Sequence, residues 1–325
     1  ENLKLSDVQT KIFQNLNNEL YRIHVKYIPQ SETSFCMVAF PIPDLGEKFE
    51  EIFEATVEIN MLDSDKYERI QQKLIDTLDL ADFIHIKGKE GNETNIVVKM
   101  QELKEPEKET NFINSGASTN IPVGEVYTTP QLKGTNGILH FKETYLGGFR
   151  YTDLKLAIKD GYIEKYSCTN FDNKDDNNKY IEVNLIFPHK TLPIGEFAIG
   201  TNTLAYTVAR KYNIIDVLPV LILEKTGPHF ALGDSCTARK EDLKIHNQIN
   251  NKRFVATDNE KSILRKKNAV EAYTNKHIDI TLAFDSIEFI TVVTHNEERI
   301  DIIRNGRFTL KGTQDLNKAL EEGDP

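Results

Sequence analysis

Acidic and histidine side chains recur in order through the C-terminal two-thirds of this chain, where turns or strand ends would hold them rigid. Two divalent cations carry a charge of about +4, which four carboxylates would neutralise while two neutral imidazoles complete the shells. Four acids and two histidines therefore predict a dinuclear site of the kind found in hydrolases. The stretches that carry them are residues 121–130, 194–202, 224–233 and 277–279, with 135–137 as a fifth stretch behind the first.

The first two acids stand beside glycines. Glu125 follows Gly124 and precedes a short strand-like run, and Glu196 lies between Gly195 and Gly200. Glycine lets the backbone approach a neighbour closely, which suits a compact site. Each acid by itself is more typical of an exposed loop than of a site, so the two are informative only as part of the set.

The third stretch combines an acid and a histidine around a turn. Glu224 follows the apolar run 218–223, which predicts a strand, and His229 comes five positions later. An odd offset puts two side chains on opposite faces of a straight strand. The Gly227-Pro228 turn breaks that alternation and would bring them together. A histidine satisfied by a loop carbonyl is the ordinary alternative.

The fourth stretch has ligand geometry within one strand. His277 and Asp279 are two positions apart and share a face, while Ile278, Ile280 and Leu282 take the opposite face. A cross-strand salt bridge is the ordinary alternative. Two histidines with four carboxylates suit zinc, cobalt or manganese.

Other chemistries lack their sequence signals. The chain has no HExxH, zinc-finger, GxSxG, GxGxxG or GxxxxGK[ST] pattern. A net charge of −10 argues against nucleic acid as a partner. No apolar stretch approaches the roughly 18 residues of a membrane span. The three cysteines, far apart in the sequence, fit a reducing compartment better than a disulfide framework.

The elements that must position these residues fall into two parts. An α/β N-terminal domain is predicted over residues 1–103, and a strand-rich C-terminal domain with the dinuclear metal site over 104–325, giving an α/β and α+β fold. Helices are expected from Ser6 onward and at 46–59, 64–78 and 203–212, and residues 170–179 read as a hairpin loop. The expected strands are 35–40, 83–86, 96–98, 137–142, 154–158, 162–166, 180–187, 218–223, 278–283 and 287–294.

The ordered motifs resemble those of the thermophilic-type metallo-aminopeptidase family, whose namesakes are aminopeptidase T and aminopeptidase S. The resemblance rests on residues 120–130, 195–196, 224–233 and 277–279 and extends from about residue 80 to residue 308. It implies a cytoplasmic exopeptidase with two divalent ions, zinc or cobalt in most members and manganese as a further candidate. It also implies peptide substrates with a free N-terminus and a homodimer that encloses the site.

Carried over by position, the resemblance assigns a metal-shell set. It makes Glu196 the bridging carboxylate and Glu125 a ligand that could also act as base. The full set is Glu125, Glu196, Glu224, His229, His277 and Asp279.

The chain departs from the family at one functional position. Seven residues after the histidine of the third motif the family has a tyrosine suited to stabilise the oxyanion, and here Cys236 stands there. A thiol is a poor hydrogen-bond donor, and losing one oxyanion donor costs roughly 10²–10³ in rate. Tyr273 is a candidate substitute. Two alternatives stay open: a metal hydrolase of another amide or ester, and a catalytically impaired metal- or peptide-binding homologue.

Overall fold

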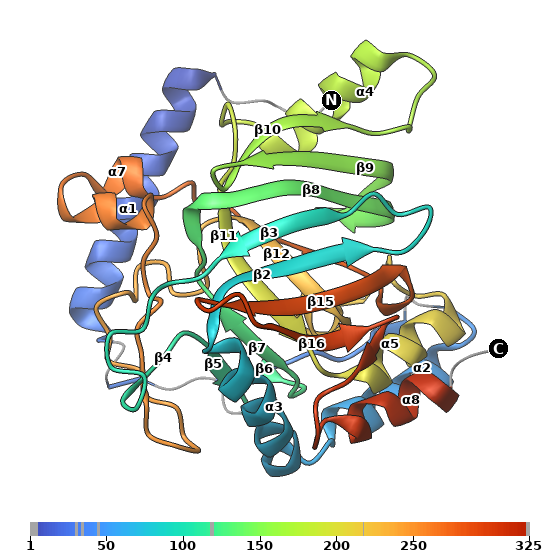
Figure 1. Ribbon diagram of the computed structural model, residues 1–325. Coiled ribbons are helices and arrows are strands. Elements are labelled where there is room, and N and C mark those ends of the chain that lie inside the picture. Colours follow the sequence, from blue (N-terminus) through green and yellow to red (C-terminus); the bar gives the residue numbers. More distant parts are fainter. Residues whose placement is uncertain are drawn as a thin grey trace.

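The chain folds into a mixed α/β structure with two main sheets and helices around them (Figure 1). The computed structural model describes residues 6–29, 32–33, 36–43, 46–117, 120–216 and 218–322. The predicted mixed α/β class is confirmed. The α-helices are α1 (Asp7–Tyr27), α2 (Phe49–Asn60), α3 (Ser64–Leu78), α4 (Lys174–Ile181), α5 (Thr203–Tyr212), α6 (Val220–Leu223), α7 (Ala269–Ala272) and α8 (Asn317–Glu322).

The larger sheet has eight strands in the order β10-β9-β8-β3-β2-β15-β16-β17. Strand β3 pairs with β8, so the sheet combines segments from both sides of residue 103. The division into two domains, residues 1–103 and 104–325, therefore stays a prediction, and the pairing of β3 with β8 gives it no support. The strands are β2 (Ala81–Gly88), β3 (Asn95–Lys99), β8 (Gln131–Leu146), β9 (Phe149–Lys159), β10 (Tyr162–Ser167), β15 (Ile287–Thr294), β16 (Arg299–Arg304) and β17 (Arg307–Phe308).

The smaller sheet has five strands in the order β14-β12-β11-β7-β5 and lies behind the larger one in Figure 1. Every neighbouring pair is antiparallel. Antiparallel sheets commonly cover a core with one face and leave the other face free for polar side chains. The strands are β5 (Ile113–Ser115), β7 (Glu125–Thr128), β11 (Ile194–Gly200), β12 (Pro228–Gly233) and β14 (His277–Thr281).

One hydrophobic core joins the two sheets. Phe197, Phe230 and Ile280 of the smaller sheet belong to the same buried cluster as Ile84 and Ile290 of the larger sheet. Because successive strand residues point to opposite faces, the residues between these core positions face away from the larger sheet. That outward face of the smaller sheet is where the polar residues of the sequence motifs lie.

Two short parallel pairs complete the strands. Strand β1 (Met37–Val38) pairs with β6 (Asn120–Ile121), and β4 (Glu109–Thr110) pairs with β13 (Arg253–Phe254). The strand predicted over residues 35–40 is reduced to Met37 and Val38, which are exposed rather than buried. Phe35 lies outside the described residues.

The predictions of a hairpin loop at 170–179 and a strand at 180–187 are wrong. Helix α4 begins after Asn173, whose side chain accepts a hydrogen bond from the Asp175 backbone N–H, and a π-helical turn continues from Glu182 to Ile186. An Asn cap followed by acids is a helix-start signal. Ile181 and Leu185 are buried at a spacing of four, which is a helical period.

The predicted strand at 218–223 is also wrong. Pro219 precedes the one-turn helix α6, and a 3₁₀ helix follows from Glu224 to Thr226. Ile222 is buried in a small apolar cluster that also contains Ala205 and Val208 of α5. An apolar run of this length does not distinguish a strand from a buried helical turn, and the proline favours the helix start.

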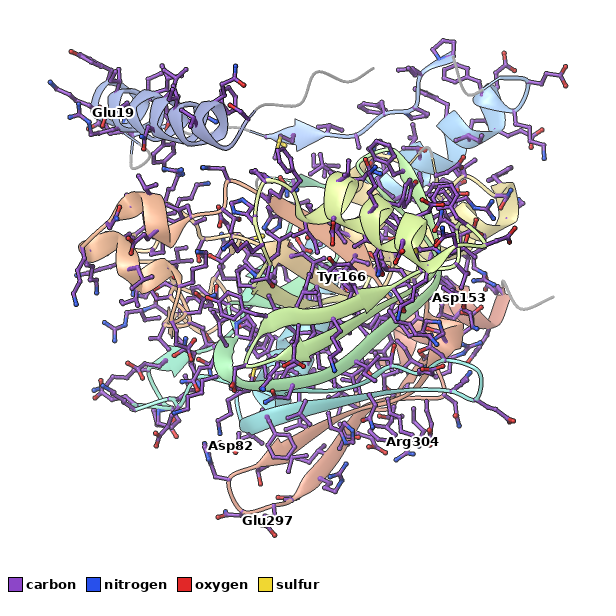
Figure 2. All side chains as sticks on the ribbon, turned by 90° about the horizontal axis from the view of Figure 1, so that it is seen from above. Glu19, Asp82, Asp153, Tyr166, Glu297 and Arg304 are labelled. Carbon is purple, nitrogen blue, oxygen red and sulfur yellow. The ribbon has the colours of Figure 1, made fainter. Side chains whose placement is uncertain are left out.

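Helix α1 confirms the prediction that Ser6 begins a helix. Ser6 and Gln9 form reciprocal capping hydrogen bonds. The predicted apolar face, however, is exposed, and Figure 2 shows α1, marked by Glu19, along the outer edge of the molecule. Within the described residues, no helix has both the length and the apolar character needed to cross a bilayer. The exposed apolar stripe consists of Val8, Ile12, Phe13, Leu16 and Leu20.

A carboxyl group at the end of α3 gives the fold a pH-dependent term. Asp79 accepts a hydrogen bond from the Asn111 backbone N–H at 2.8 Å, and burial raises its pKa to about 6. A raised carboxyl pKa contributes stability below the unfolded value near 4, and this is lost as pH rises through 6. We expect Asp79→Asn to raise the unfolding free energy by roughly 1–2 kcal/mol at pH 8 and by little at pH 4. Urea unfolding at both pH values measures this, and equal gains at both would contradict it.

Candidate metal centre

The smaller sheet places five of the six predicted ligands on its outward face. Strand β12 lies between β11 and β14, with Ala231 opposite Asp279 and Gly233 opposite His277. Alternation along each strand directs the ligand side chains away from the core. On β7, for example, Val126 points into the core and Glu125 points away from it. The prediction that His277 and Asp279 share a strand face is confirmed, with Ile280 buried on the other side.

Glycines beside Glu196 allow the surrounding backbone to close in. A Cβ at Gly195 would overlap the Asp234 carbonyl, and one at Gly200 would overlap the carbonyls of Lys225 and Gly227. These positions therefore exclude any side chain. The two glycines therefore let the backbone on either side of β12, at residues 225–227 and at Asp234, approach β11 closely.

The first ligand group joins β7, β11 and β12. His229 Nε2 lies 3.6 Å from Glu125 Oε2 and 3.5 Å from Glu196 Oε1, and all three side chains are buried. His229 Nδ1 lies 3.2 Å from the Gly227 carbonyl oxygen. A carbonyl on one ring nitrogen makes that nitrogen the donor and leaves Nε2 free as a ligand atom.

The second ligand group is centred on His277. Its Nε2 lies 3.2 Å from Asp279 Oδ1, 4.0 Å from Glu196 Oε2 and 3.6 Å from the Cys236 sulfur. His277 Nδ1 is 2.7 Å from the Asp234 carbonyl oxygen, so this ring is oriented in the same way as His229. Glu196 belongs to both groups, with Oε1 toward His229 and Oε2 toward His277.

The donor atoms fit divalent cations. Glu196 Oε2 is a buried carboxylate oxygen with no hydrogen-bond partner, whereas Asp279 Oδ1 faces the His277 ring at 3.2 Å. A buried charged oxygen with no partner is costly, so Glu196 Oε2 indicates a site for a cation. Bonds of about 2.0–2.2 Å at tetrahedral angles put nitrogen and oxygen ligands about 3.4 Å apart, close to the separations around His229.

The two histidines carry protons when cations are missing. Burial lowers the pKa of each, but the carboxylates outweigh it and raise the pKa of His229 to about 9 and that of His277 to about 10. Only the neutral imidazole binds a metal, so uptake of cations releases these protons. The acids thus stabilise positive charge at this site, whether protons or metal ions supply it.

Glu224 lies beside the two groups rather than within one. Its carboxylate accepts a hydrogen bond from Lys225 Nζ at 2.7 Å, and the same Nζ donates to Glu125 Oε1 at 2.9 Å. Burial, and then the charge of Glu125, raise the pKa of Glu224 to about 7. The sequence prediction placed Glu224 with His229; the structure instead ties it to Glu125 through a buried lysine.

Sequence reasoning missed Lys225 and Tyr127. The Lys225 side chain is fully buried, and the two carboxylates hold its pKa well above the usual range. Tyr127 follows Glu125 by two positions, so strand alternation places both on the ligand face. This spacing is the sequence feature that could have identified Tyr127. Burial, together with Cys236 and the site acids, raises the pKa of the Tyr127 phenol well above its usual value.

Cys236 lies at the site, and Tyr273 does not replace the missing phenol there. The Tyr273 hydroxyl donates to Glu241 at 2.9 Å, and the Arg239 guanidinium covers its ring. The Cys236 residue is exposed as a whole, but its sulfur lies against buried Glu196. Desolvation and this negative charge raise the pKa of the thiol well above its usual value.

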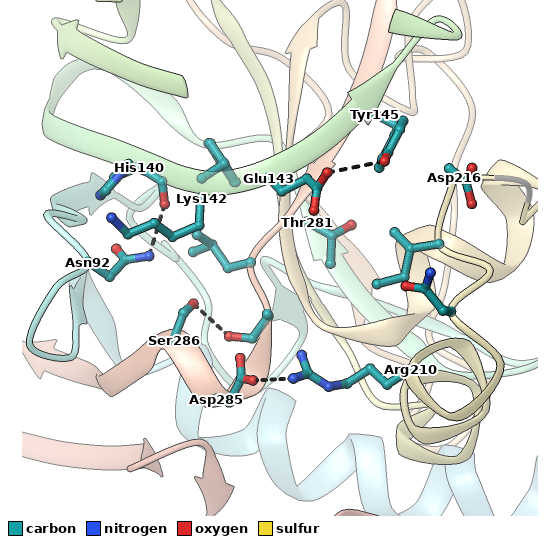
Figure 3. Close-up of a pocket in the computed structure, with 15 residues that line it drawn as sticks. Asn92, His140, Lys142, Glu143, Tyr145, Arg210, Asp216, Thr281, Asp285 and Ser286 are labelled. Carbon is teal, nitrogen blue, oxygen red and sulfur yellow. Dashed lines mark hydrogen bonds and ion pairs between the residues drawn. The ribbon is translucent and has the colours of Figure 1, made fainter. Parts of the chain in front are cut away.

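The fifth motif stretch and the pocket of Figure 3 lie elsewhere. Thr135 donates to the Gln131 carbonyl at 2.6 Å within β8, so residues 135–137 have a structural role in the larger sheet. The pocket of about 450 Å³ in Figure 3 is lined by residues such as His140, Arg210 and Asp285, and by none of the predicted ligands. A smaller pocket of about 140 Å³ adjoins the site, because Tyr127 lines it.

Comparison with known proteins places the chain in a family. The sequence matches the thermophilic metalloprotease family M29 over residues 3–308, so the likeness begins well before residue 80. The comparison with curated proteins gave no match. The fold is similar to wild-type AmpT from Thermus thermophilus, with a TM-score of 0.60 and 15% identity over 94% of this chain and 72% of that one. A weaker similarity, with a TM-score of 0.47 and 13% identity over 80% and 64% of the two chains, is to 2,5-dihydroxypyridine dioxygenase from Pseudomonas putida KT2440. Because the family match spans nearly the whole sequence, the chain belongs to the thermophilic metalloproteases of family M29.

Proposed function

We propose that this protein is a two-metal aminopeptidase that removes N-terminal amino acids from peptides. The observation that carries the proposal is a pair of ligand groups on one face of a sheet that share Glu196, whose Oε2 is buried without a hydrogen-bond partner. Membership of a metalloprotease family and the resemblance to metallo-aminopeptidase motifs support the reaction class. Zinc or cobalt, with manganese as a further candidate, suits these nitrogen and oxygen donors.

Five of the six predicted residues would act as ligands, and Glu224 would act beside them. Glu125, Glu196 and His229 would hold one ion, and Glu196, His277 and Asp279 would hold the other, with Glu196 shared between the two. When bound, such ions lower the pKa of water and polarise the scissile carbonyl. We assign the proton transfer to Glu224, because it lies beside Glu125, held by Lys225, but belongs to neither ligand group.

The charge of the site fits a substrate with a free amine. Four carboxylates surround the ligand face, and Lys225 offsets one of them. The remaining negative charge attracts both metal ions and the ammonium group of a peptide N-terminus. The small pocket beside Tyr127, lined also by Ile113, Phe254 and His246, is our choice for the first side chain of the substrate.

The assembly and location that the resemblance implies remain part of the proposal. The exposed apolar stripe of α1 supports a homodimer, since a monomer gains nothing from leaving five such residues in water. The three cysteines, Cys36, Cys168 and Cys236, are all free, which supports a reducing, cytoplasmic compartment.

Substrate trimming with and without a blocked amine tests the proposed reaction. We expect about two equivalents of zinc or cobalt per chain and stepwise release of amino acids from an unblocked peptide. The N-acetylated form of the same peptide should be cleaved at least about 100-fold more slowly, because the anchoring charge is lost. Metal analysis and mass spectrometry of a time course measure both. Rapid internal cleavage of the acetylated peptide would contradict the exopeptidase assignment.

A second function stays in view because of Cys236. A protein that binds two ions yet turns over no peptide would be a metal- or peptide-binding homologue whose catalysis is impaired. Turnover of another amide or ester, with peptides left intact, would identify a different metal hydrolase. The same metal analysis, followed by a panel of aminoacyl and acyl amides, separates these outcomes.

A further inference from the structure

The thiol at the family tyrosine position lies among metal-ligand atoms. Cys236, Glu196 and His277 offer ligand atoms that all lie within 4.8 Å of one another. Cys236 reaches this place from the loop after β12, whereas His277 and Glu196 come from β14 and β11. A phenol at the same position would be a hydrogen-bond donor. A thiol is a weak donor but, as thiolate, a strong ligand.

The separation of sulfur and nitrogen matches a shared ion. Zinc bonds of about 2.3 Å to sulfur and about 2.0 Å to imidazole nitrogen, at a tetrahedral angle, put the two atoms about 3.5 Å apart. Cys236 Sγ lies 3.6 Å from His277 Nε2. His277 Nδ1 meets the Asp234 carbonyl, so Nε2 is the nitrogen left for an ion.

An independent observation points to a cation at this same place. Glu196 Oε2, on a carboxylate that is 2% exposed, has no hydrogen-bond partner and lies 4.0 Å from His277 Nε2. Glu196, His277 and Cys236 thus offer three donors to one ion, and Asp279 Oδ1 lies 3.2 Å from His277 Nε2 as a neighbouring fourth. Lys225 already offsets one of the four carboxylates, so a thiolate supplies the fourth negative charge for two divalent ions.

We propose that Cys236 is a direct metal ligand, so that the His277 half of the centre is a Cys-His-Asp-Glu site selective for zinc. This inference rests on the proposed dinuclear function. The thiol proton leaves to solvent as the sulfur–metal bond forms. A soft sulfur donor favours zinc or cobalt over manganese and magnesium in this half. The His229 half keeps only nitrogen and oxygen donors and the open positions that substrate needs.

Cobalt(II) spectroscopy of the whole protein tests the thiolate directly. Titration of the metal-free protein should give a sulfur-to-cobalt charge-transfer band in the near ultraviolet that saturates with one of two bound equivalents. Cys236→Ser should lose this band and bind that equivalent at least about 100-fold more weakly, since even indirect partners of a ligand contribute 10–100-fold. The exposed Cys36 provides the matched control, and Cys36→Ser should keep the band unchanged.

The outcomes distinguish this inference from the proposed dinuclear function on which it rests. Two bound cobalt ions without a charge-transfer band in the wild-type protein would overturn the Cys236 ligand and leave the dinuclear site standing. No cobalt binding at all would overturn the dinuclear site and this inference with it. If Cys236→Ser does not fold, Cys236→Ala and the wild-type spectrum still decide, and zinc should protect Cys236 from alkylation while Cys36 reacts.

Discussion

Glu196→Gln is expected to reduce peptide hydrolysis by about 10³-fold or more and to leave less than half of the metal bound. Glutamine has the same shape, but it removes the negative charge that both ligand groups share and turns one oxygen into an N–H donor. Glu196 contacts the first group through Oε1 and the second through Oε2, so one substitution affects both ions. Metal analysis, initial rates and melting curves with and without zinc measure the effect.

Stability separates a lost ligand from a lost fold. Without metal ions, Glu196 faces the protonated rings of His229 and His277, so glutamine should lower the melting temperature of the metal-free protein but leave a single cooperative transition. The rise that zinc causes in the wild-type protein should disappear. Glu182→Gln is the matched control, because Glu182 is exposed and accepts one hydrogen bond from the Tyr166 hydroxyl at 2.7 Å. Equal losses in both variants would show that Glu196 is not a ligand.

Strong periodicity and capping signals predicted much of the fold. Helices α1, α2, α3 and α5, and strands such as β9, β10 and β15, lie close to their predicted positions. Residues 180–187 and 218–223 failed for one shared reason. Each is a short apolar run in which burial, rather than alternation, sets the pattern, so the sequence alone does not separate helix from strand.

The exposure of α1 and the pairing of β3 with β8 were beyond sequence reasoning for another reason. Both depend on which surfaces meet, and an amphipathic pattern states only that a helix has an apolar face, not what covers it. The Ser6 cap and the stripe from Val8 to Leu20 were correctly read as a helix, yet the described part of the chain leaves that stripe in water. Long-range strand order likewise leaves no local signal.

The site was more predictable than the fold around it. Strand alternation at His277 and Asp279 and the glycines around Glu196 are local features with direct geometric consequences, and the structure brings all six predicted residues into one region. Their roles as ligands remain part of the proposal. Lys225 was missed because a lysine between a strand-like run and a glycine reads as exposed. Its burial follows only from the close approach of Glu125 and Glu224.

Lys225→Met is expected to destabilise the metal-free protein by about 3–5 kcal/mol, the usual cost of removing one partner from a buried charge cluster. The Lys225 ammonium has no access to water and contacts Glu125 at 2.9 Å and Glu224 at 2.7 Å. Methionine fills a similar volume without charge, so the two buried carboxylates lose their common counterion. Urea unfolding in the presence of a chelator measures this loss, and an exposed pair gives its control. Lys108 pairs with Glu105 at the surface, and Lys108→Met should leave the free energy of unfolding nearly unchanged.

Zinc should stabilise Lys225→Met more than it stabilises the wild-type protein. Without the ammonium, the site carries one more negative charge, so cations that bind only the folded state gain affinity and shift the unfolding equilibrium further. Adding Glu224→Gln to Lys225→Met should return part of the stability lost in the metal-free protein, because one of the two unpaired charges is then removed. Two results would show that Lys225 is not the internal counterion of this centre. One is that Lys225→Met lowers the free energy of unfolding no more than Lys108→Met does. The other is that zinc stabilises Lys225→Met and the wild-type protein equally. A large loss that zinc selectively reverses would mean that the lysine holds the acids together until the metal ions take over their charge.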